Sequence, residues 1–349
     1  MENMKGLRYL GRGEARIAKM PVPETKEGQI LLEVAVSALC GSERSDYENG
    51  CSFVSGHEFA GIVRETNGCR RLKAGDRVTV NVLAGCGDCY YCRTGQPQFC
   101  RELHVCQGGH AQYAAVPEEC CIPLPDYMDF EAGVLLGGDT LGVAYRAVNK
   151  IRPDFGRVAA VIGAGPIGLG VISLLKYYGY YAAVMEKNQL RCHYAAELAG
   201  ADEVLGQFSD TCPGERLREL TGGLGADVVF ECSGSPLAER TALEIVRPAG
   251  TVVFCGENYK GLEIIPSDHI IHKEVTLTGA FYFTRNDFYG LCEIYKRGFD
   301  PKTAVTHRMH LDRAPDACSM FFSGKTGKVL LYRDQTCRTG HGTEEKWKD

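Results

Sequence analysis

Hydrophobic residues in the first 125 positions fall in short runs that are separated by turn residues. Valine, isoleucine and leucine concentrate in segments 29–39, 60–65 and 76–83, and clusters of Gly, Asn and Lys such as KAGD lie between them. β-branched residues in short runs with such boundaries are typical of strands, and helical periodicity is weak here. The pattern therefore predicts a mostly β unit at the N-terminal end.

From about residue 147 onward, apolar runs alternate with segments of helical length. The apolar runs are VAAVIG, AAVME, ADEVL, ADVVFECSG and TVVFCG, and NQLRCHYAAELAG and LAERTALEIVRPAG are two of the segments between them. Near-continuous apolar strands that alternate with helices indicate a parallel sheet covered on both faces. We therefore predict an α/β fold in which a doubly wound parallel-sheet domain is inserted in the β unit.

The alternation stops after Gly279, and the later segments predict a return to the β unit. NDFYGLCEIYKRG is expected to form a helix, HRMHLDRAPDACSMFFSG a strand and a helix, and KVLLY a last strand. The predicted domains are residues 1–146, 147–285 and 286–349. The last of these includes a polar tail from Arg333 that we expect to be mobile.

The chain of 349 residues has a formal net charge of −5, with 44% apolar and 24% charged residues. This composition fits a globular protein of about two domains. The negative charge argues against nucleic acid or an anionic membrane as the main partner, because both require basic surfaces. Residues 158–175 carry no charge, but their four glycines and Pro166 predict a strand, a turn and a helix start rather than a membrane span. The N-terminus has no apolar core, so we expect a cytoplasmic protein.

Seventeen cysteines without an export signal favour metal binding over disulfides. Four of them lie in the segment GCGDCYYCRTGQPQFC: Cys86, Cys89, Cys92 and Cys100. This spacing lets one loop, residues 86–100, surround a tetrahedral ion, and four thiolates leave no open position, so we predict structural zinc. An iron–sulfur cluster fits the ligand type but not the usual spacing, and a zinc-ribbon nucleic-acid module would require more basic residues around the loop. Unligated cysteines are the remaining alternative.

The segment AAVIGAGPIGLG carries Gly163, Gly165 and Gly168 in GxGxxG register between a predicted strand and a predicted helix. In a dinucleotide site the first glycine makes the turn, the second admits the pyrophosphate, and the third lets the helix pack on the strand. Glu186 closes the next predicted strand, where a carboxylate binds ribose hydroxyls and repels a 2′-phosphate, so NAD is favoured over NADP. Nearby cations such as Arg191 weaken that preference. Glycines that serve only the turn, and a solvated Glu186, are the alternatives.

A second candidate metal site combines Cys40 in CGSE with His57 in SGHEFAG. Alone, either residue would more often be packed in a core. Both lie at predicted strand ends of the same β unit, however, and thiolate and imidazole are zinc ligands. We therefore predict that the two residues share one ion.

The ordered motifs CGSE, GHEFAG, GCGDCYYC…C, GAGPIG and ECSG resemble those of the zinc-dependent medium-chain alcohol and polyol dehydrogenase family, as far as about Tyr332. The resemblance implies a mostly β, GroES-like catalytic domain with an inserted Rossmann domain. It also implies that Cys40 and His57 bind a catalytic zinc, that Glu58 is a ligand or lies beside the metal, and that Ser42 relays the alcohol proton. The cofactor-binding residues it implies are Gly163, Gly165, Pro166, Ile167, Gly168, Glu186, Arg191, Cys232, Ser233 and Gly234.

The sequence departs from the family pattern at two positions. Many relatives place a third ligand in a Gly-Cys or Glu-Pro segment, whereas this chain has Gly137 and Gly138 in LLGGDTLG. Asp139 is therefore the expected third ligand, with a helix N-cap as its alternative role. Ser45 stands where several relatives carry a histidine that passes the proton to solvent. The resemblance therefore does not say which residue performs the last step of the proton relay.

The resemblance implies hydride transfer between NAD and the hydroxyl of a secondary alcohol, polyol, sugar or cyclitol, through a zinc-bound alkoxide, and the reverse reduction of a ketone. Two zinc ions per chain are expected, one catalytic and one structural. A zinc-independent reductase of activated double bonds and a non-catalytic NAD-binding redox sensor are the alternatives. Segment 275–283 resembles the edge strand through which relatives join cofactor domains, so a homodimer or homotetramer is expected, without nucleic-acid or membrane partners.

Overall fold

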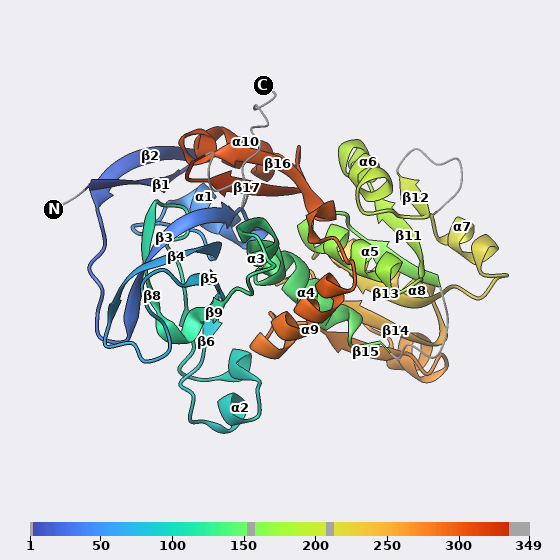
Figure 1. Ribbon diagram of the computed structural model, residues 1–349. Coiled ribbons are helices and arrows are strands. Elements are labelled where there is room, and N and C mark those ends of the chain that lie inside the picture. Colours follow the sequence, from blue (N-terminus) through green and yellow to red (C-terminus); the bar gives the residue numbers. More distant parts are fainter. Residues whose placement is uncertain (1–2, 152–157, 207–212, 335–349) are drawn as a thin grey trace. The chain divides into compact units, whose positions relative to one another are not determined.

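The computed structural model divides into two compact units, which are described separately (Figure 1). The described residues are 3–151, 158–206 and 213–334. Within them, the first unit runs to Gly138 and resumes over His307–Ser323 and from Val329. The second unit takes Asp139–Thr306 and Gly324–Lys328. The predicted tail beyond Asp334 lies outside the described residues.

A seven-stranded sheet forms the frame of the first unit. Its strands follow the order β16-β17-β3-β4-β5-β9, and β8 also pairs with β3. The strands are β3 (Gln29–Ala38), β4 (Glu58–Asn67), β5 (Arg77–Val80), β8 (Tyr113–Pro117), β9 (Cys121–Pro123), β16 (Val305–His310) and β17 (Lys328–Tyr332). The apolar run in β3 is buried along its length after Gln29, because β3 has neighbours on both sides.

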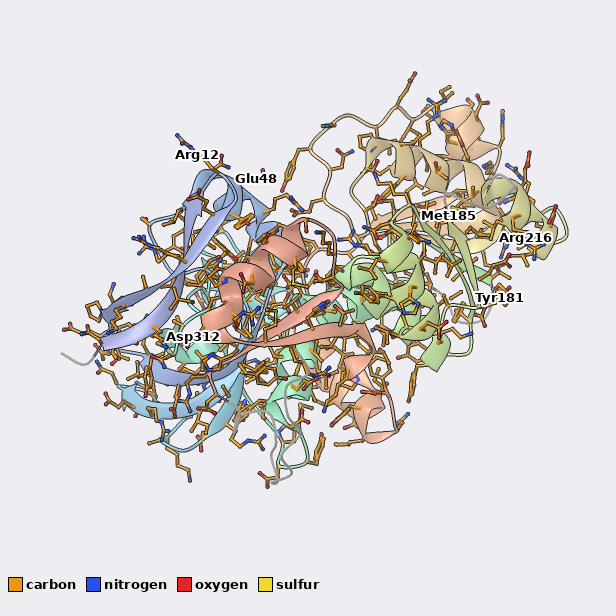
Figure 2. All side chains as sticks on the ribbon, turned by 90° about the horizontal axis from the view of Figure 1, so that it is seen from above. Arg12, Glu48, Tyr181, Met185, Arg216 and Asp312 are labelled. Carbon is orange, nitrogen blue, oxygen red and sulfur yellow. The ribbon has the colours of Figure 1, made fainter. Side chains whose placement is uncertain are left out.

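Short elements complete the first unit. They are the hairpin β1 (Asn3–Gly11) and β2 (Glu14–Pro21), the small pair β6 (Leu83–Ala84) and β7 (His104–Val105), and the helices α1 (Arg44–Asn49), α2 (Tyr90–Arg93), α3 (Phe130–Leu136) and α10 (Ala314–Phe322). Arg12, at the turn of the hairpin, has φ +58 and donates its backbone N–H to the carbonyl of Glu48 in α1 over 2.7 Å (Figure 2). The β1–β2 turn is thereby tied to α1.

The second unit is a six-stranded parallel sheet in the order β12-β11-β10-β13-β14-β15. Its strands are β10 (Val158–Ile162), β11 (Tyr181–Glu186), β12 (Glu203–Gly206), β13 (Ala226–Glu231), β14 (Val246–Phe254) and β15 (Thr276–Gly279). Its helices are α4 (Asp139–Val148), α5 (Pro166–Tyr177), α6 (Gln189–Glu197), α7 (Pro213–Leu220), α8 (Pro236–Ile245) and α9 (Arg285–Lys296). This strand order, 3-2-1-4-5-6 along the chain, is that of a Rossmann domain and confirms the predicted fold class.

The boundaries between the two compact units fall after Gly138 and after Thr306, whereas the sequence predicted domain boundaries near residues 146 and 285. The difference arises because α4 and α9 pack within the second unit. A Cβ on Gly170 of α5 would lie 2.5 Å from the carbonyl of Thr140, so α4 and α5 approach closely at this glycine. Arg146 of α4 forms an ion pair with Asp287 of α9 at 3.1 Å.

Two elements of the second unit also differ in length from the prediction. β14 begins at Val246, within a segment that was expected to be helical, because Val246 pairs with Ala226 of β13. The strand expected over residues 275–283 is only Thr276–Gly279. The chain leaves the sheet there, and Phe283 is buried against Gly142 instead. Within the described ranges, none of the helices has the length and apolar character that a membrane crossing requires.

Candidate active site

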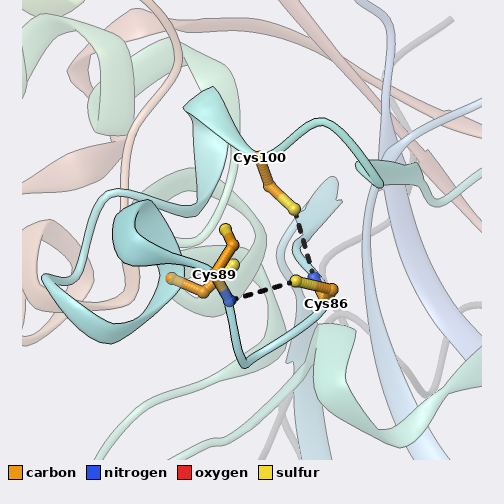
Figure 3. A group of neighbouring side chains, drawn as sticks. Cys86, Cys89 and Cys100 are labelled. Atoms are coloured by element: carbon orange, nitrogen blue, oxygen red, sulfur yellow. Dashed lines mark hydrogen bonds between the residues drawn. The ribbon is translucent and has the colours of Figure 1, made fainter.

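The four-thiol loop lies between β6 and β7 and is made of the closely spaced cysteines of residues 86–100. The sulfur atoms of Cys86, Cys89, Cys92 and Cys100 lie within 4.8 Å of one another. Backbone N–H groups of the loop donate to these sulfurs. Among them, that of Cys86 donates to Cys100 Sγ and that of Cys89 to Cys86 Sγ, each over 3.4 Å (Figure 3). Such donors stabilise thiolates, and four thiolates are the donor set of a structural zinc. The loop residues therefore fit this metal.

The pairing of β3 with β4 builds the second cluster. In this antiparallel pair Ala38, the last residue of β3, lies opposite Glu58, the first residue of β4. Cys40 follows Ala38 by two residues and His57 directly precedes Glu58, so the register brings both ligands to one end of the sheet. Both were predicted to share one ion from residue type and strand-end position alone.

Asp139 joins this second cluster from the start of α4. One ligand atom from each of Cys40, His57, Glu58 and Asp139 lies within 4.8 Å of the others. The last three residues are buried, and Cys40 is half-buried. Asp139 is the first residue of α4 itself, rather than the residue before it. One thiolate, one imidazole and two carboxylates are a donor set that suits zinc.

Gly138 allows the close packing behind this cluster. A Cβ on Gly138 would lie 2.6 Å from Glu58 Oε2 and 2.5 Å from the carbonyl oxygen of Val134. Any side chain there would displace the Glu58 carboxylate or the backbone of α3. The glycine pair that was noted as a departure from the family pattern thus has a packing role beside Glu58.

The two serines behave differently. Ser42 lies in a 3₁₀ turn (Gly41–Glu43), is exposed, and its hydroxyl donates to Cys40 Sγ over 3.3 Å. The Ser45 hydroxyl accepts from the Asn49 side chain over 3.3 Å within α1. Ser42 is therefore the one of the two that lies beside the cluster through a direct contact.

A buried carboxylate behind the cluster was not predicted from the sequence. Glu43 accepts from the Tyr9 hydroxyl over 2.7 Å and from the Cys40 backbone N–H over 3.2 Å, and it lies 2.9 Å from His110 Nε2. Glu43 also accepts from the Ser55 hydroxyl over 3.5 Å, and its Oε1 lies 3.9 Å from His57 Nδ1. Burial alone would raise the pKa of Glu43, but the His110 and His57 imidazoles and the Tyr9 hydroxyl outweigh it and lower the pKa to about 2. In the sequence, the sign that could have led to Glu43 was an acidic residue three positions after Cys40.

The glycine motif of the second unit forms the turn from β10 to α5. Gly163 has φ +92, a conformation that favours glycine. A Cβ on Gly168 would clash with the carbonyl oxygen of Gly163, so the third glycine is needed where α5 packs on the turn. Among the described residues, the atom nearest to a Cβ added at Gly165 is Arg191 Nη1 at 4.0 Å, which leaves room for a ligand beside the second glycine. Pro166 and Ile167 open α5, whose N-terminal end favours a phosphate.

Glu186 closes β11 and is tied to the glycine turn. It is buried, and its carboxylate accepts from the backbone N–H of Ala164 and of Asn188, each over 2.8 Å. Glu186 is therefore held against the backbone of the glycine turn and of the residues after β11. Arg191 lies on α6 and approaches the same glycine turn.

The ECSG segment follows β13 and packs against the glycine turn. The buried Glu231 accepts from the backbone N–H groups of Ser233 over 2.8 Å and Gly234 over 3.1 Å, which shapes the turn after Cys232. A Cβ on Gly163 would lie 2.9 Å from Ser233 Cβ, so the two turns are in contact. β10 and β13 are the neighbours at which the strand order reverses, which is where open α/β sheets bind ligands.

Two family models match the chain. Residues 26–126 match the alcohol dehydrogenase GroES-like domain, and residues 166–297 match the zinc-binding dehydrogenase domain. These ranges lie within the β frame of the first unit and the parallel sheet of the second.

Similar proteins match over nearly the whole chain. A zinc-type alcohol dehydrogenase-like protein of Escherichia coli (strain K12) is 30% identical over 95% of this chain and 99% of its own length. The (R,R)-butanediol dehydrogenase of Bacillus subtilis (strain 168) is 33% identical over 88% of this chain and 93% of its own length. The crystal structure of an alcohol dehydrogenase of E. coli CFT073, complexed with cofactor NADH, has a TM-score of 0.84 and 25% identity over 95% of this chain and all of that one. From its motifs, fold and these matches, the chain belongs to the zinc-type medium-chain alcohol dehydrogenase family.

Proposed function

We propose that this protein oxidises a secondary hydroxyl of a diol or polyol to a ketone with NAD as hydride acceptor, and catalyses the reverse reduction. The convergence of Cys40, His57, Glu58 and Asp139 carries the proposal. A catalytic zinc has three protein ligands and keeps one position for substrate, so Cys40, His57 and Asp139 would be the ligands and Glu58 would lie beside the metal. The family's activity on CH–OH groups and the butanediol relative support the class of substrate.

The residues of the second cluster would hold zinc, which supplies a Lewis acid toward the substrate oxygen when bound. His57 presents one ring nitrogen to the cluster, while Glu43 lies beside its Nδ1 and can orient the ring. The Ser42 hydroxyl, which contacts Cys40 Sγ, is placed to accept the proton of the substrate hydroxyl and pass it to solvent, since Ser42 is exposed. With NAD bound, the nicotinamide would accept a hydride from the carbon that carries the hydroxyl, so the products would be ketone, NADH and one proton.

We propose NAD rather than NADP as the cofactor. Glu186 places a buried carboxylate at the end of β11, beside the glycine turn. A carboxylate there can accept from ribose hydroxyls, and it repels the extra charge of a 2′-phosphate.

A structural zinc in residues 86–100 would bring the total to two ions per chain. The four sulfurs close a complete donor set, so the loop leaves no position for substrate. We further propose a homodimer or homotetramer. β15 is the last strand of the parallel sheet, and its open edge can pair with a second copy.

The proposal is tested by measuring zinc per chain and then NADH absorbance with 2,3-butanediol stereoisomers, sorbitol and simple alcohols. Two ions per chain and turnover of at least one diol or polyol are expected. Turnover of activated double bonds by metal-free protein would favour the zinc-independent reductase, and NADH binding without any turnover would favour a redox sensor. Either outcome would overturn the proposal.

The cofactor assignment has its own test in Glu186→Ala. A hydrogen bond to a charged group contributes about 1.5–3 kcal/mol, so the KM for NAD should rise by roughly tenfold or more. The KM for NADP should rise less, or fall, because the repulsion is removed. Equal changes for both cofactors would discard the assignment.

A further inference from the structure

The buried histidine behind the second cluster has no counterpart among the predicted site residues. We propose that His110 is a positioning residue for the metal ligands: through Glu43 it fixes His57 and the backbone of Cys40. This inference rests on the proposed zinc site and assigns a role to a residue whose ring contacts Glu43 and Ser37.

Both ring nitrogens of His110 are engaged. Nε2 lies 2.9 Å from Glu43 Oε2, and Nδ1 lies 2.9 Å from the Ser37 hydroxyl, with the whole residue buried. Oxygens of a carboxylate accept hydrogen bonds, so we assign the ring hydrogen of His110 to Nε2, from which it donates to Glu43 Oε2. Ser37, in the buried strand β3, holds the other side of the ring.

The backbone around His110 is also fixed. Its N–H donates to the carbonyl of Ser55 over 3.0 Å, and its carbonyl accepts from the Leu7 N–H over 2.8 Å. A Cβ on Gly56 would lie 2.7 Å from Cγ of the His110 ring, and Gly56 has φ +99. The imidazole therefore packs against the backbone that directly precedes His57.

The two oxygens of Glu43 divide their partners. Oε2 accepts from the Tyr9 hydroxyl, from His110 and, over 3.5 Å, from the Ser55 hydroxyl. Oε1 faces the other way, 3.2 Å from the Cys40 N–H and 3.9 Å from His57 Nδ1. These partners of Oε2 orient the carboxylate so that Oε1 is held toward both metal ligands. Partners behind a ligating histidine commonly change metal affinity in this way.

The experiment measures zinc affinity by competition with a chelator, on the full chain. His110→Leu removes the donor to Glu43, and loss of such a partner typically weakens metal binding by about 10- to 100-fold. One ion per chain should weaken to this extent while the other is unaffected, because the four-thiol loop shares none of these contacts. His272→Leu, at an exposed histidine of the second unit, is the matched control and should leave both affinities unchanged.

A second pair of variants covers the case in which His110→Leu does not fold. In His110→Gln the side-chain amide can reach Glu43 as Nε2 does, and in His110→Asn the shorter amide can reach only Ser37. We expect His110→Gln to retain most of the zinc affinity and His110→Asn to lose it, although both new side chains are polar and of similar size. Equal affinities in the two variants, or wild-type affinity in folded His110→Leu, would overturn the inference.

Cys40→Ala separates this inference from the proposed function. If Cys40→Ala loses one ion and His110→Leu binds zinc as tightly as the wild type, the site is correct and only the role of His110 is wrong. If Cys40→Ala keeps both ions with wild-type affinity, the proposed zinc site is wrong, and the proposed role of His110 is then wrong as well.

Discussion

The four-thiol loop and the cluster around Cys40 and His57 each offer four side chains to a metal, but the chain assembles them in opposite ways. The thiols come from residues 86–100, and two of their sulfurs accept hydrogen bonds from backbone within the same loop. The second set comes from three separate segments and depends on the register of β3 with β4.

The donors differ as well as the assembly. Four identical soft ligands on a loop can close around an ion without help from the rest of the fold, and they leave no place for substrate. A thiolate, an imidazole and two carboxylates, three of them on buried residues, need a folded support that holds them in place. We therefore expect the loop to serve stability and the second cluster to serve catalysis.

The strongest test of this contrast is Cys40→Ala. Loss of the metal's Lewis acidity removes several kcal/mol of transition-state stabilisation, so turnover should fall by at least about 1000-fold. Zinc should drop from two ions to one per chain. Cys69→Ala, a thiol in neither cluster, is the control. A variant that keeps both ions would show that the second cluster does not hold the catalytic metal.

Ser42→Ala should have the next largest effect. A positioned proton-transfer group contributes about 100-fold or more, so NADH formation should slow by that factor while both ions remain bound. Ser42→Thr should restore most of the rate because it keeps the hydroxyl. Ser45→Ala is the matched control, since its hydroxyl is engaged within α1. Equal losses in the two alanine variants would remove Ser42 from the relay.

Gly138→Ala tests how far the second cluster depends on packing. The added methyl would lie 2.6 Å from Glu58 Oε2, and overpacking of this kind costs about 1–3 kcal/mol. Unfolding by urea should show this loss, and chelator competition should show weaker binding of one ion by roughly tenfold. At Gly41 an added Cβ meets nothing within 4 Å, so Gly41→Ala should change neither measurement. Equal stability and equal zinc affinity in Gly138→Ala and Gly41→Ala would contradict the packing role of Gly138.

Cys92→Ser should change turnover least. The four-thiol loop should lose its ion, whose binding in comparable peptides is worth on the order of 10 kcal/mol, and limited proteolysis should then cut within residues 86–100. Turnover per folded molecule should fall much less than in Cys40→Ala. A loss of turnover as large as that of Cys40→Ala, with the second ion still bound, would show that the two clusters do not divide their tasks in this way.

Much of this arrangement could be predicted from local sequence. The spacing of the four thiols and of the three glycines, and the apolar runs of β10 to β14, depend on neighbours along the chain and led to the correct fold class. Cys40 and His57 were found because each lies at the end of a strand. For Asp139 the sequence predicts a metal ligand, with a helix cap as the alternative, because the segment LLGGDTLG offers no other ligand.

Other features depended on contacts between distant residues. Glu43 and His110 are 67 positions apart, and no periodicity connects them. α4 packs closely on α5 at Gly170, and Arg146 of α4 forms an ion pair with Asp287 of α9. Neither contact can be predicted from the sequences of these helices alone. The sequence by itself determined the local chemistry, because a loop or turn is governed by short-range spacing. Only the tertiary structure decided which carboxylates and imidazoles face each other, because that depends on strand register and on how closely buried elements approach.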